Sequence, residues 1–486
     1  IQLIETHISW VILTGEYAYK IKKPINLGFL DFSTLEKRLF CCNEELRLNS
    51  RMAAAIYLDV VPISGSREQP QLHGTGDAIE YAVKMVQFPQ QAQLDNMLAN
   101  GELGKPHMDA IAQLVAEFHQ STDVAADDSD FGDPEHVYQP VAENFTQIRQ
   151  HLHTNKYDDQ LAGLEHWGKA EFNALRPLLE QRKHDGFIRE CHGDMHLRNL
   201  VWFNGQPLAF DCLEFNPALR WIDTLSEVAF LFMDLQDRNQ PQLAQRFLNS
   251  YLEQSGDYQG MGVFNFYLAY RALVRAKVDA IRAGQQSISD AERRKAEEEF
   301  YVYLNLALSY TRRRKPKLII TRGMSASGKS TLTQPLLELM GAIRLRSDVE
   351  RKRLFGIDPG MESTAEVDKG IYTVEAGVKT YEKLRLLAQA LLEAGISVIV
   401  DAAFLKYEQR QLFNELADQK QAPLIIIEFT ASADTLRRRI KARTDDVSDA
   451  DLSVLEHQLA TAVPVHESER SCLIEVDTET DFDAAG

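Results

Sequence analysis

The sequence is short of cysteines, of long apolar runs and of positive charge, and each shortage excludes a class of protein. Its 486 residues include five cysteines with no C-x-x-C spacing, which excludes a disulfide framework and the usual pattern of a zinc site. We therefore expect reduced thiols in a cytoplasmic protein. No apolar run approaches the roughly 20 residues of a membrane-spanning helix, and no charged and then apolar leader follows Ile1. We expect neither a membrane partner nor a signal peptide.

The formal net charge of −18 disfavours a nucleic-acid partner and an anionic membrane surface, because both repel an acidic protein. The two basic runs are local. Residues 312–315 fall in a predicted linker, and residues 437–439 fall where a phosphate-binding lid is expected.

The spacing of apolar residues divides the chain into three predicted domains. Residues 1–89 have the pattern of strands with one helix, residues 90–312 that of a mostly helical lobe, and residues 317–486 that of alternating strands and helices. Such an alternation predicts a parallel sheet with helices on both faces. The expected fold class is therefore α/β and α+β multidomain. In the last domain, strands are expected at 317–321, 342–346, 397–400 and 424–429.

A motif of the form D-x-x-x-x-N stands beside a predicted hairpin. Two expected strands flank Asn204-Gly205, the strongest short signal for a two-residue turn. The register of such a hairpin places Asp211 diagonally beside Asn199, so that amide and carboxylate oxygens form a magnesium site. Asp194, one loop away, is placed to receive a proton from an attacking hydroxyl. This is the layout of a kinase catalytic loop followed by a metal-binding Asp.

A second phosphate-binding motif, G-x-x-x-x-G-K-[ST] or Walker A, lies between an apolar run and a predicted helix. Backbone N–H groups of such a loop hold phosphates, Lys329 reaches the terminal phosphates, and Ser330 binds magnesium. The chain thus carries two nucleotide-type sites, with ATP and Mg²⁺ as the expected cofactors. The expected nucleotide-binding residues here are Gly323, Ser325, Ala326, Ser327, Gly328, Lys329, Ser330 and Thr331.

The third predicted strand places Lys20 and Lys22 on the same side. Lys20 completes the residue set of a kinase if it binds the nucleotide phosphates and pairs with Glu45 on the next helix. We expect this role for Lys20 and surface positions for Lys22 and Lys23.

Residues 1–312 resemble the aminoglycoside phosphotransferase family, the small-molecule branch of the protein-kinase fold. The motif that carries the resemblance is H-G-D-x-H-x-x-N at 192–199. The resemblance implies a two-lobed kinase-like domain with Asp194 as the catalytic base and Asn199 and Asp211 as magnesium ligands.

The same resemblance implies that Lys20 binds the ATP phosphates with Glu45 as its partner. It implies structural roles near the catalytic loop for His192, His196 and Asp223. The segment 5–9, where a phosphate-covering loop belongs, has no glycine.

Residues 317–486 resemble the P-loop kinases that include zeta toxins and polynucleotide kinase, so the whole chain resembles a fused bifunctional bacterial protein. Asp348 and Arg351 form a D-x-x-R motif after the second strand. The resemblance implies that Asp348 accepts the proton of the acceptor hydroxyl and that Arg351 orients the acceptor or the phosphate. Asp401 ends a buried strand, where it acts as a magnesium-binding acid or, in the alternative, as a helix N-cap.

Arginines of a closing lid stabilise charge on a transferred phosphoryl group. We expect Arg439 and Arg443 to do so, and we expect Arg410, on the helix after Asp401, to face the acceptor.

The leading hypothesis is a phosphotransferase with two kinase modules that transfer the γ-phosphoryl group of ATP to hydroxyl groups of small molecules. In one alternative, one module is a nucleotide-sensing regulatory domain. In another, the P-loop module phosphorylates a nucleic-acid or nucleotide hydroxyl. The acidic chain argues against nucleic acid, and the presence of Asp194 and Asp348 argues against a sensor. The acceptors, the coupling of the two sites, the preference for ATP or GTP and the oligomeric state stay open.

Overall fold

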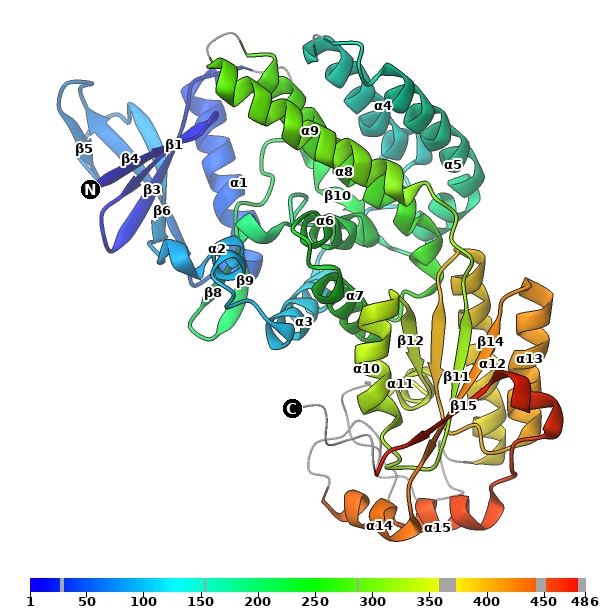
Figure 1. Ribbon diagram of the computed structural model, residues 1–486. Helices are drawn as coiled ribbons and strands as arrows, with labels where there is room; N and C mark the ends of the chain where they lie inside the picture. Colours follow the sequence, from blue (N-terminus) through cyan, green and yellow to red (C-terminus); the bar gives the residue numbers. More distant parts are fainter. Residues whose placement is uncertain (27–29, 153, 286–287, 358–372, 443–451, 480–486) are drawn as a thin grey trace. The chain divides into compact units, whose positions relative to one another are not determined.

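The computed structural model describes residues 1–26, 30–152, 154–285, 288–357, 373–442 and 452–479, and the chain divides into two compact units (Figure 1). The N-terminal unit holds Ile1–Gln240 and Val263–Thr311, and the C-terminal unit holds Pro241–Gly262 and Arg312–Gly486. The segment Pro241–Gly262 thus clusters with the C-terminal unit, although both of its chain neighbours belong to the N-terminal one. The domain boundaries expected at 89 and at 312–317 stay predictions.

The N-terminal unit begins with a six-stranded antiparallel sheet in the order β1-β2-β3-β6-β4-β5. Helix α1 (Leu35–Ala53) begins after Thr34, whose side chain accepts a hydrogen bond from the N–H of Lys37. The helix packs on the sheet through a core that includes Cys42 and Ala53. The strands are β1 (Gln2–Glu5), β2 (Ser9–Leu13), β3 (Tyr17–Lys22), β4 (Tyr57–Gly65), β5 (Pro70–Leu72) and β6 (Glu80–Val86).

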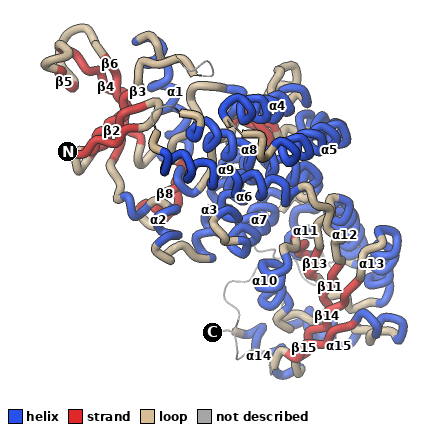
Figure 2. The backbone as a smooth tube through the Cα atoms, turned by 45° about the horizontal axis from the view of Figure 1, so that its top comes forward, coloured by secondary structure: helices blue, strands red, loops and turns tan. Residues whose placement is uncertain are grey.

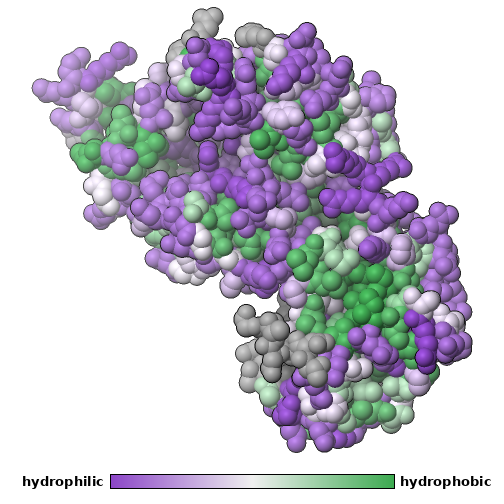
Figure 3. All heavy atoms as spheres, viewed as in Figure 1, coloured by the Kyte–Doolittle hydropathy of each residue, from purple (hydrophilic) through white to green (hydrophobic). Residues whose placement is uncertain are grey.

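Helices form most of the remaining N-terminal unit (Figure 2). Every residue of helix α6 from Thr224 to Leu235 is buried, so this helix forms part of the core of the lobe. The face of this unit that Figure 3 shows is mainly hydrophilic. The helices are α2 (Leu94–Ala99), α3 (Lys105–Ser121), α4 (Pro134–His151), α5 (Asp158–His184), α6 (Thr224–Asp237), α8 (Phe264–Ala283) and α9 (Asp290–Tyr310).

The C-terminal unit is built on a parallel sheet in the order β12-β13-β11-β14-β15. The expected α/β fold is confirmed, and each expected strand matches an observed one to within one residue at either end. The last strand, β15, was not expected. The strands are β11 (Leu318–Arg322), β12 (Ile343–Arg346), β13 (Val398–Asp401), β14 (Leu424–Thr430) and β15 (Leu473–Asp477).

The order in which strands are added to this sheet changes side at β11. Strands β12 and β13 lie on one side of β11, and β14 and β15 lie on the other. In open α/β sheets, ligands bind at such a point, beyond the carboxyl ends of the strands. The helices of this unit are α7 (Pro241–Ser255), α10 (Lys329–Met340), α11 (Ser347–Leu354), α12 (Val374–Glu393), α13 (Tyr407–Lys420), α14 (Ala433–Lys441) and α15 (Leu452–Thr461). Among the described residues of the two units, no helix combines the length and the apolar character that crossing a bilayer requires.

Candidate active sites

The predicted hairpin after the D-x-x-x-x-N motif is confirmed. Strands β8 (Leu200–Phe203) and β9 (Gln206–Ala209) pair with Phe203 opposite Gln206. Both turn residues have positive φ, 52° at Asn204 and 81° at Gly205, as a two-residue hairpin turn requires. The N–H of Phe210 donates to the carbonyl of Asn199 at 2.9 Å. This bond brings Asp211 next to the end of the catalytic loop.

Asp194 and Asn199 are in direct contact. The amide nitrogen of Asn199 donates to the backbone carbonyl and to Oδ2 of Asp194, both at 3.0 Å. This arrangement leaves the amide oxygen of Asn199 as the acceptor that a magnesium ion prefers. Burial acts to raise the pKa of Asp194, but the nearby imidazoles of His196 and His192 outweigh it and hold that pKa well below its ordinary value. Asp194 is therefore ionised at neutral pH.

Asp211 approaches Lys20 from the other side of the site. Lys20 Nζ lies 2.5 Å from Oδ1 of Asp211 and 2.8 Å from Oε1 of Glu45. The Asp211 backbone has a φ of 63°, and its N–H donates to the hydroxyl of Tyr57 at 3.2 Å. The Asp211 side chain is 47% exposed, so its carboxylate can reach a ligand. The expected pairing of Lys20 with Glu45 is present.

The expectation of a surface position for Lys22 is wrong. Lys22 has no exposed surface, and its Nζ donates to Oε2 of Glu45 at 2.7 Å and also to Oε1 of Glu214. Burial acts to lower the pKa of Lys22, but the carboxylates of Glu214 and Glu45 raise it above its ordinary value. Lys23 is largely covered too, with a side chain 14% exposed that pairs with the exposed Glu5. Glu45 thus holds two lysines, and the second was missed because its partner Glu214 lies 192 residues away.

Glu227 on α6 fixes the backbone of the loop at 192–199, and nothing in the sequence singled it out. Its carboxylate accepts hydrogen bonds from the N–H groups of His192 at 3.1 Å and Gly193 at 2.7 Å. Burial acts to raise the pKa of Glu227, but the bond with His119 and the loop N–H groups lower it to about 2. Loop geometry therefore depends on an ionised and fully buried carboxylate.

The three residues expected to brace the loop are all buried, in contacts of different kinds. His192 contacts the carbonyl of Phe210 through Nε2 at 2.9 Å. His196 Nε2 lies 3.4 Å from Oδ2 of Asp194. Asp223 forms two bonds with Arg182, at 2.6 and 2.7 Å, and caps α6.

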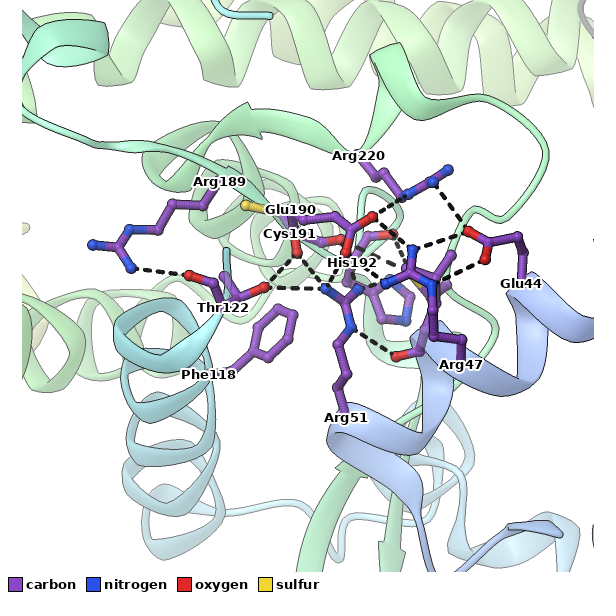
Figure 4. A network of polar contacts seen from close by, with 12 residues as sticks. Glu44, Arg47, Arg51, Phe118, Thr122, Arg189, Glu190, Cys191, His192 and Arg220 are labelled. Atoms are coloured by element: carbon purple, nitrogen blue, oxygen red, sulfur yellow. Dashed lines mark hydrogen bonds and ion pairs between the residues drawn. The ribbon is translucent and has the colours of Figure 1, made fainter. Parts of the chain in front are cut away.

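A network of arginines joins α1 to the strand that leads into the catalytic loop (Figure 4). Strand β7 (Ile188–Glu190) ends in a buried carboxylate, Glu190. Arg47 and Arg51 from α1 and Arg220 from beyond the loop all bind this carboxylate, at 2.8, 3.0 and 3.1 Å. The helix that carries Glu45 is thereby fixed to the segment that carries Asp194.

The predicted P-loop connects β11 to α10 and forms one wall of a cavity of about 170 Å³. Gly328 has a φ of 86° at the start of the helix. Lys329 Nζ donates to the carbonyls of Gly323 at 2.9 Å and Met324 at 2.7 Å, across the loop. The P-loop residues that line the cavity are Ser325, Ala326, Ser327, Gly328, Lys329, Ser330 and Thr331.

The cavity also brings together the acidic and basic residues expected from the second half of the chain. Ser330 Oγ donates to Oδ2 of Asp401 at 2.7 Å, so two hard oxygen ligands of the kind that magnesium prefers are adjacent. Asp348 and Arg351 line the same cavity. The structure also places Arg346 there, a residue that the sequence did not single out.

The lid arginines are only partly described. Arg439 lies near the P-loop, with Nη1 donating to the carbonyl of Ala326 at 3.4 Å, but it does not line the cavity. Arg443 lies outside the described residues. The expectation for Arg410 is wrong, because its side chain is fully buried and binds Glu469 at 2.8 and 2.9 Å. Arg410 therefore joins parts of the unit and does not face an acceptor.

Comparison with known proteins agrees with this division of chemistry. Residues 76–264 match the model of a family described as "Phosphotransferase enzyme family", and residues 318–465 match one described as "AAA domain". The uncharacterized proteins Rv2004c of Mycobacterium tuberculosis and Mb2027c of Mycobacterium bovis are each 31% identical to this chain over 453 residues, covering 93% of it and 88% of each relative. The chain belongs to their family. The resemblances to a phosphotransferase and to a P-loop kinase are confirmed, and the chain is a kinase-type phosphotransferase.

Two solved structures show weaker likeness. A sugar kinase from Janibacter sp. HTCC2649 is 20% identical, covers 35% of this chain and 88% of its own, and has a TM-score of 0.27. An ethanolamine kinase from Plasmodium vivax is 10% identical, covers 64% of this chain and 83% of its own, and has a TM-score of 0.39. Likenesses of this degree say nothing about the substrate.

Proposed function

We propose that the chain carries two magnesium-dependent kinase sites, each transferring the γ-phosphoryl group of ATP to a hydroxyl group of a small molecule. The observation that carries the proposal is a repeated set of groups. Each site gathers an Asp, a Lys and two further side chains with oxygen atoms of the kind that magnesium prefers. We assign proton acceptance to the Asp and phosphate binding to the Lys. Such a set positions the reactants and stabilises charge, which is how phosphoryl transfer is catalysed.

In the N-terminal site, Asp194 accepts the proton of the acceptor hydroxyl. Lys20, oriented by Glu45, binds nucleotide phosphates. Asn199 and Asp211 would hold the magnesium ion, which neutralises phosphate charge when bound. The contact of Asn199 with Asp194 and the exposure of Asp211 support these roles.

In the C-terminal site, Asp348 acts as the general base. Lys329 and the P-loop N–H groups bind the phosphates. Ser330 and Asp401 would hold magnesium. Arg351 orients the acceptor or the phosphate. We assign to Arg439 the stabilisation of transferred charge, and its contact with the P-loop carbonyl of Ala326 supports this role. We also propose that the C-terminal module belongs with the P-loop kinases that include zeta toxins and polynucleotide kinase.

We also propose that the protein is located in the cytoplasm. All five cysteines are free, and four of them are buried, which fits a reducing environment.

The experiment that tests the function measures transfer of labelled γ-phosphate from ATP to a metabolite library by wild type, Asp194→Asn and Lys329→Ala. General acid–base catalysis contributes on the order of 10²–10⁴ in rate, which Asp194→Asn should remove. Lys329→Ala removes the phosphate-binding amine of the other site. Each single variant should therefore lose the products of its own site and keep those of the other. If Asp194→Asn keeps every product of the wild type, the N-terminal site is not a kinase. If that site binds ATP without any Asp194-dependent product, it is a sensor. A parallel assay offers an oligonucleotide with a free 5′-hydroxyl, and a labelled product that depends on Lys329 would assign the second site to nucleic acid.

A further inference from the structure

Helix α7 is an integral part of the C-terminal unit, although it lies between α6 and α8 in the sequence. It lies beside α10 and β12 (Figure 1). Its Asn249 bonds to the backbone at the start of β12, an edge strand of the sheet. The amide nitrogen of Asn249 donates to the carbonyl of Ala342 at 3.0 Å, and its oxygen accepts from the N–H of Arg344 at 2.8 Å. This pair of bonds repeats what a neighbouring strand would offer, so α7 is fixed in register with β12.

One turn further along α7, Glu253 binds two arginines of β12. Its Oε1 accepts from Nη1 of Arg346 at 2.8 Å, and its Oε2 lies 3.7 Å from Nη2 of Arg344. Arg344 in turn donates to the carbonyl of Ser330 at 3.0 Å. The carbonyl of Glu253 also accepts from Arg353 at 2.6 Å. Glu253 thus has two contacts that do not involve Arg346, one through its carboxylate and one through its backbone carbonyl.

Arg346 ends β12 and lines the cavity of the C-terminal site. It lies opposite Asp401 in the register of β12 and β13. Burial acts to lower the pKa of Arg346, but the carboxylates of Glu253, Asp401 and Asp348 raise it, so its positive charge is secure. Its side chain is 12% exposed and is tied to Glu253, which fixes its direction.

Outside the P-loop, the cavity lining holds two arginines, Arg346 and Arg351, and two aspartates, Asp348 and Asp401. Asp401 bonds to Ser330 at the proposed magnesium site, so Asp348 is the one remaining carboxylate beside the two arginines. Asp348 stands between Arg346 and Arg351 in the sequence, and all three line the cavity, so two guanidinium groups share it with this carboxylate. An acceptor that brings its hydroxyl to Asp348 therefore lies within reach of these cations. Guanidinium groups bind carboxylates and phosphates with strong, charge-assisted hydrogen bonds.

We propose that Arg346, held in place by Glu253, binds an anionic group of the acceptor, a carboxylate or a phosphate, in the C-terminal site. This inference rests on the proposed kinase function of that site. Arg346 contacts the substrate, and Glu253 is a positioning residue that acts through it. The substrate class that follows is a small molecule with both a hydroxyl and an anionic group.

The test compares three probes on one carbon frame: glycerol, glycerate and glycerol 3-phosphate. Binding is measured by calorimetry on the full chain, saturated with magnesium and a non-hydrolysable ATP analogue so that the P-loop is occupied. Asp194→Asn serves as the background, which keeps the N-terminal site from turnover in a parallel transfer assay. We expect at least one anionic probe to bind about tenfold or more tightly than glycerol, and which one does so separates a carboxylate from a phosphate.

Substitutions then assign this preference to residues. Arg346→Gln should abolish the preference for the anion, Arg346→Lys should retain part of it, and Glu253→Gln should reduce it about three- to tenfold. The affinity for the ATP analogue should stay unchanged, which excludes simple misfolding. The matched control is Arg246→Gln, on the same helix, whose partner Glu338 lies outside the cavity lining and which should leave the preference intact.

Equal binding of all three probes, or an unchanged preference in Arg346→Gln, would overturn the proposal. If Glu253→Gln keeps the preference for the anion, as Arg246→Gln should, the positioning role proposed for Glu253 is contradicted. Failure of the proposed function has a separate signature, because the calorimetry needs no turnover. In that case the anion binds as expected, but no labelled product depends on Lys329.

Discussion

Ser330 Oγ donates a 2.7 Å hydrogen bond to Oδ2 of Asp401, although 71 residues separate the two in the chain. The contact exists because β11 and β13 are parallel neighbours, so the loops at their carboxyl ends meet at one edge of the sheet. Parallel pairing thus converts two distant sequence positions into one oxygen-rich site.

If these two residues hold the same ion, their effects on activity should not add. Ser330→Ala and Asp401→Asn should each lower phosphate transfer that depends on Lys329, by about tenfold or more. The double variant should be about as slow as the slower single one, since the second change removes a ligand of a site already lost. A magnesium titration of the transfer rate measures this, and rates that multiply would contradict a shared site.

The buried lysine pair of the N-terminal unit allows a test of stability with a built-in control. Lys22→Met leaves the buried carboxylate of Glu214 without its lysine and leaves Glu45 with Lys20 alone, which should lower the free energy of unfolding by about 3–5 kcal/mol. Lys23→Met removes a pair with the exposed Glu5, and the cost should be less than about 1 kcal/mol.

Urea unfolding followed by tryptophan emission suits this comparison, because all four tryptophans belong to the N-terminal unit. The signal therefore reports on that unit by itself. Equal effects of the two substitutions would mean that the buried network contributes nothing beyond a surface pair.

Glu227 predicts a pH dependence of stability. Its pKa falls from 4.5 to about 2 on folding, so its contribution is complete above about pH 4.5 and is lost as the pH falls toward 2. A shift of this size corresponds to about 3 kcal/mol. Glu227→Gln should therefore destabilise the N-terminal unit at pH 7, and the gap to the wild type should narrow at pH 3.

Unfolding at the two pH values measures the gap, with Glu180→Gln as the control because its side chain is 57% exposed. A gap that stays constant between pH 7 and pH 3 would show that the charge of Glu227 is not what fixes the loop.

Alanine substitutions at two glycines distinguish the cost of backbone strain from the cost of steric crowding. Gly193 and Gly205 have similar positive φ values, 87° and 81°, so alanine costs about 1–2 kcal/mol of backbone strain at either. At Gly193 the new Cβ would lie 2.7 Å from the carbonyl of Leu219, whereas at Gly205 it meets nothing within 4 Å. Gly193→Ala should therefore cost about 1–3 kcal/mol more in tryptophan-monitored unfolding, and similar losses would show that the loop can shift away.

Short-range signals in the sequence were enough for the hairpin and the P-loop. Asn204-Gly205 requires a particular backbone conformation, and it fixed the register that brings Asp211 beside Asn199. The burial of Lys22 could not be predicted in this way. It depends on the contact with Glu214, and a local sequence pattern cannot reveal a partner that is distant in the chain.

The same limit explains why Glu190 and Glu227 were missed. Each is an ordinary carboxylate until arginines or loop N–H groups from distant segments surround it. The expectation for Arg410 failed for another reason. Structural and functional residues both occur on a helix that follows a strand such as β13, and only the contact with Glu469 shows that Arg410 is structural.

The bonds between Asn249 and β12 also bear on what happens if the chain is cut near residue 312. A fragment that begins there keeps the P-loop and the sheet but loses α7, and with it the cover over the N–H of Arg344 and the carbonyl of Ala342. Bare strand edges recruit strands from other molecules. Two such fragments would therefore pair through their exposed β12 strands and form one continuous sheet. In the intact protein α7 covers this edge and prevents that pairing.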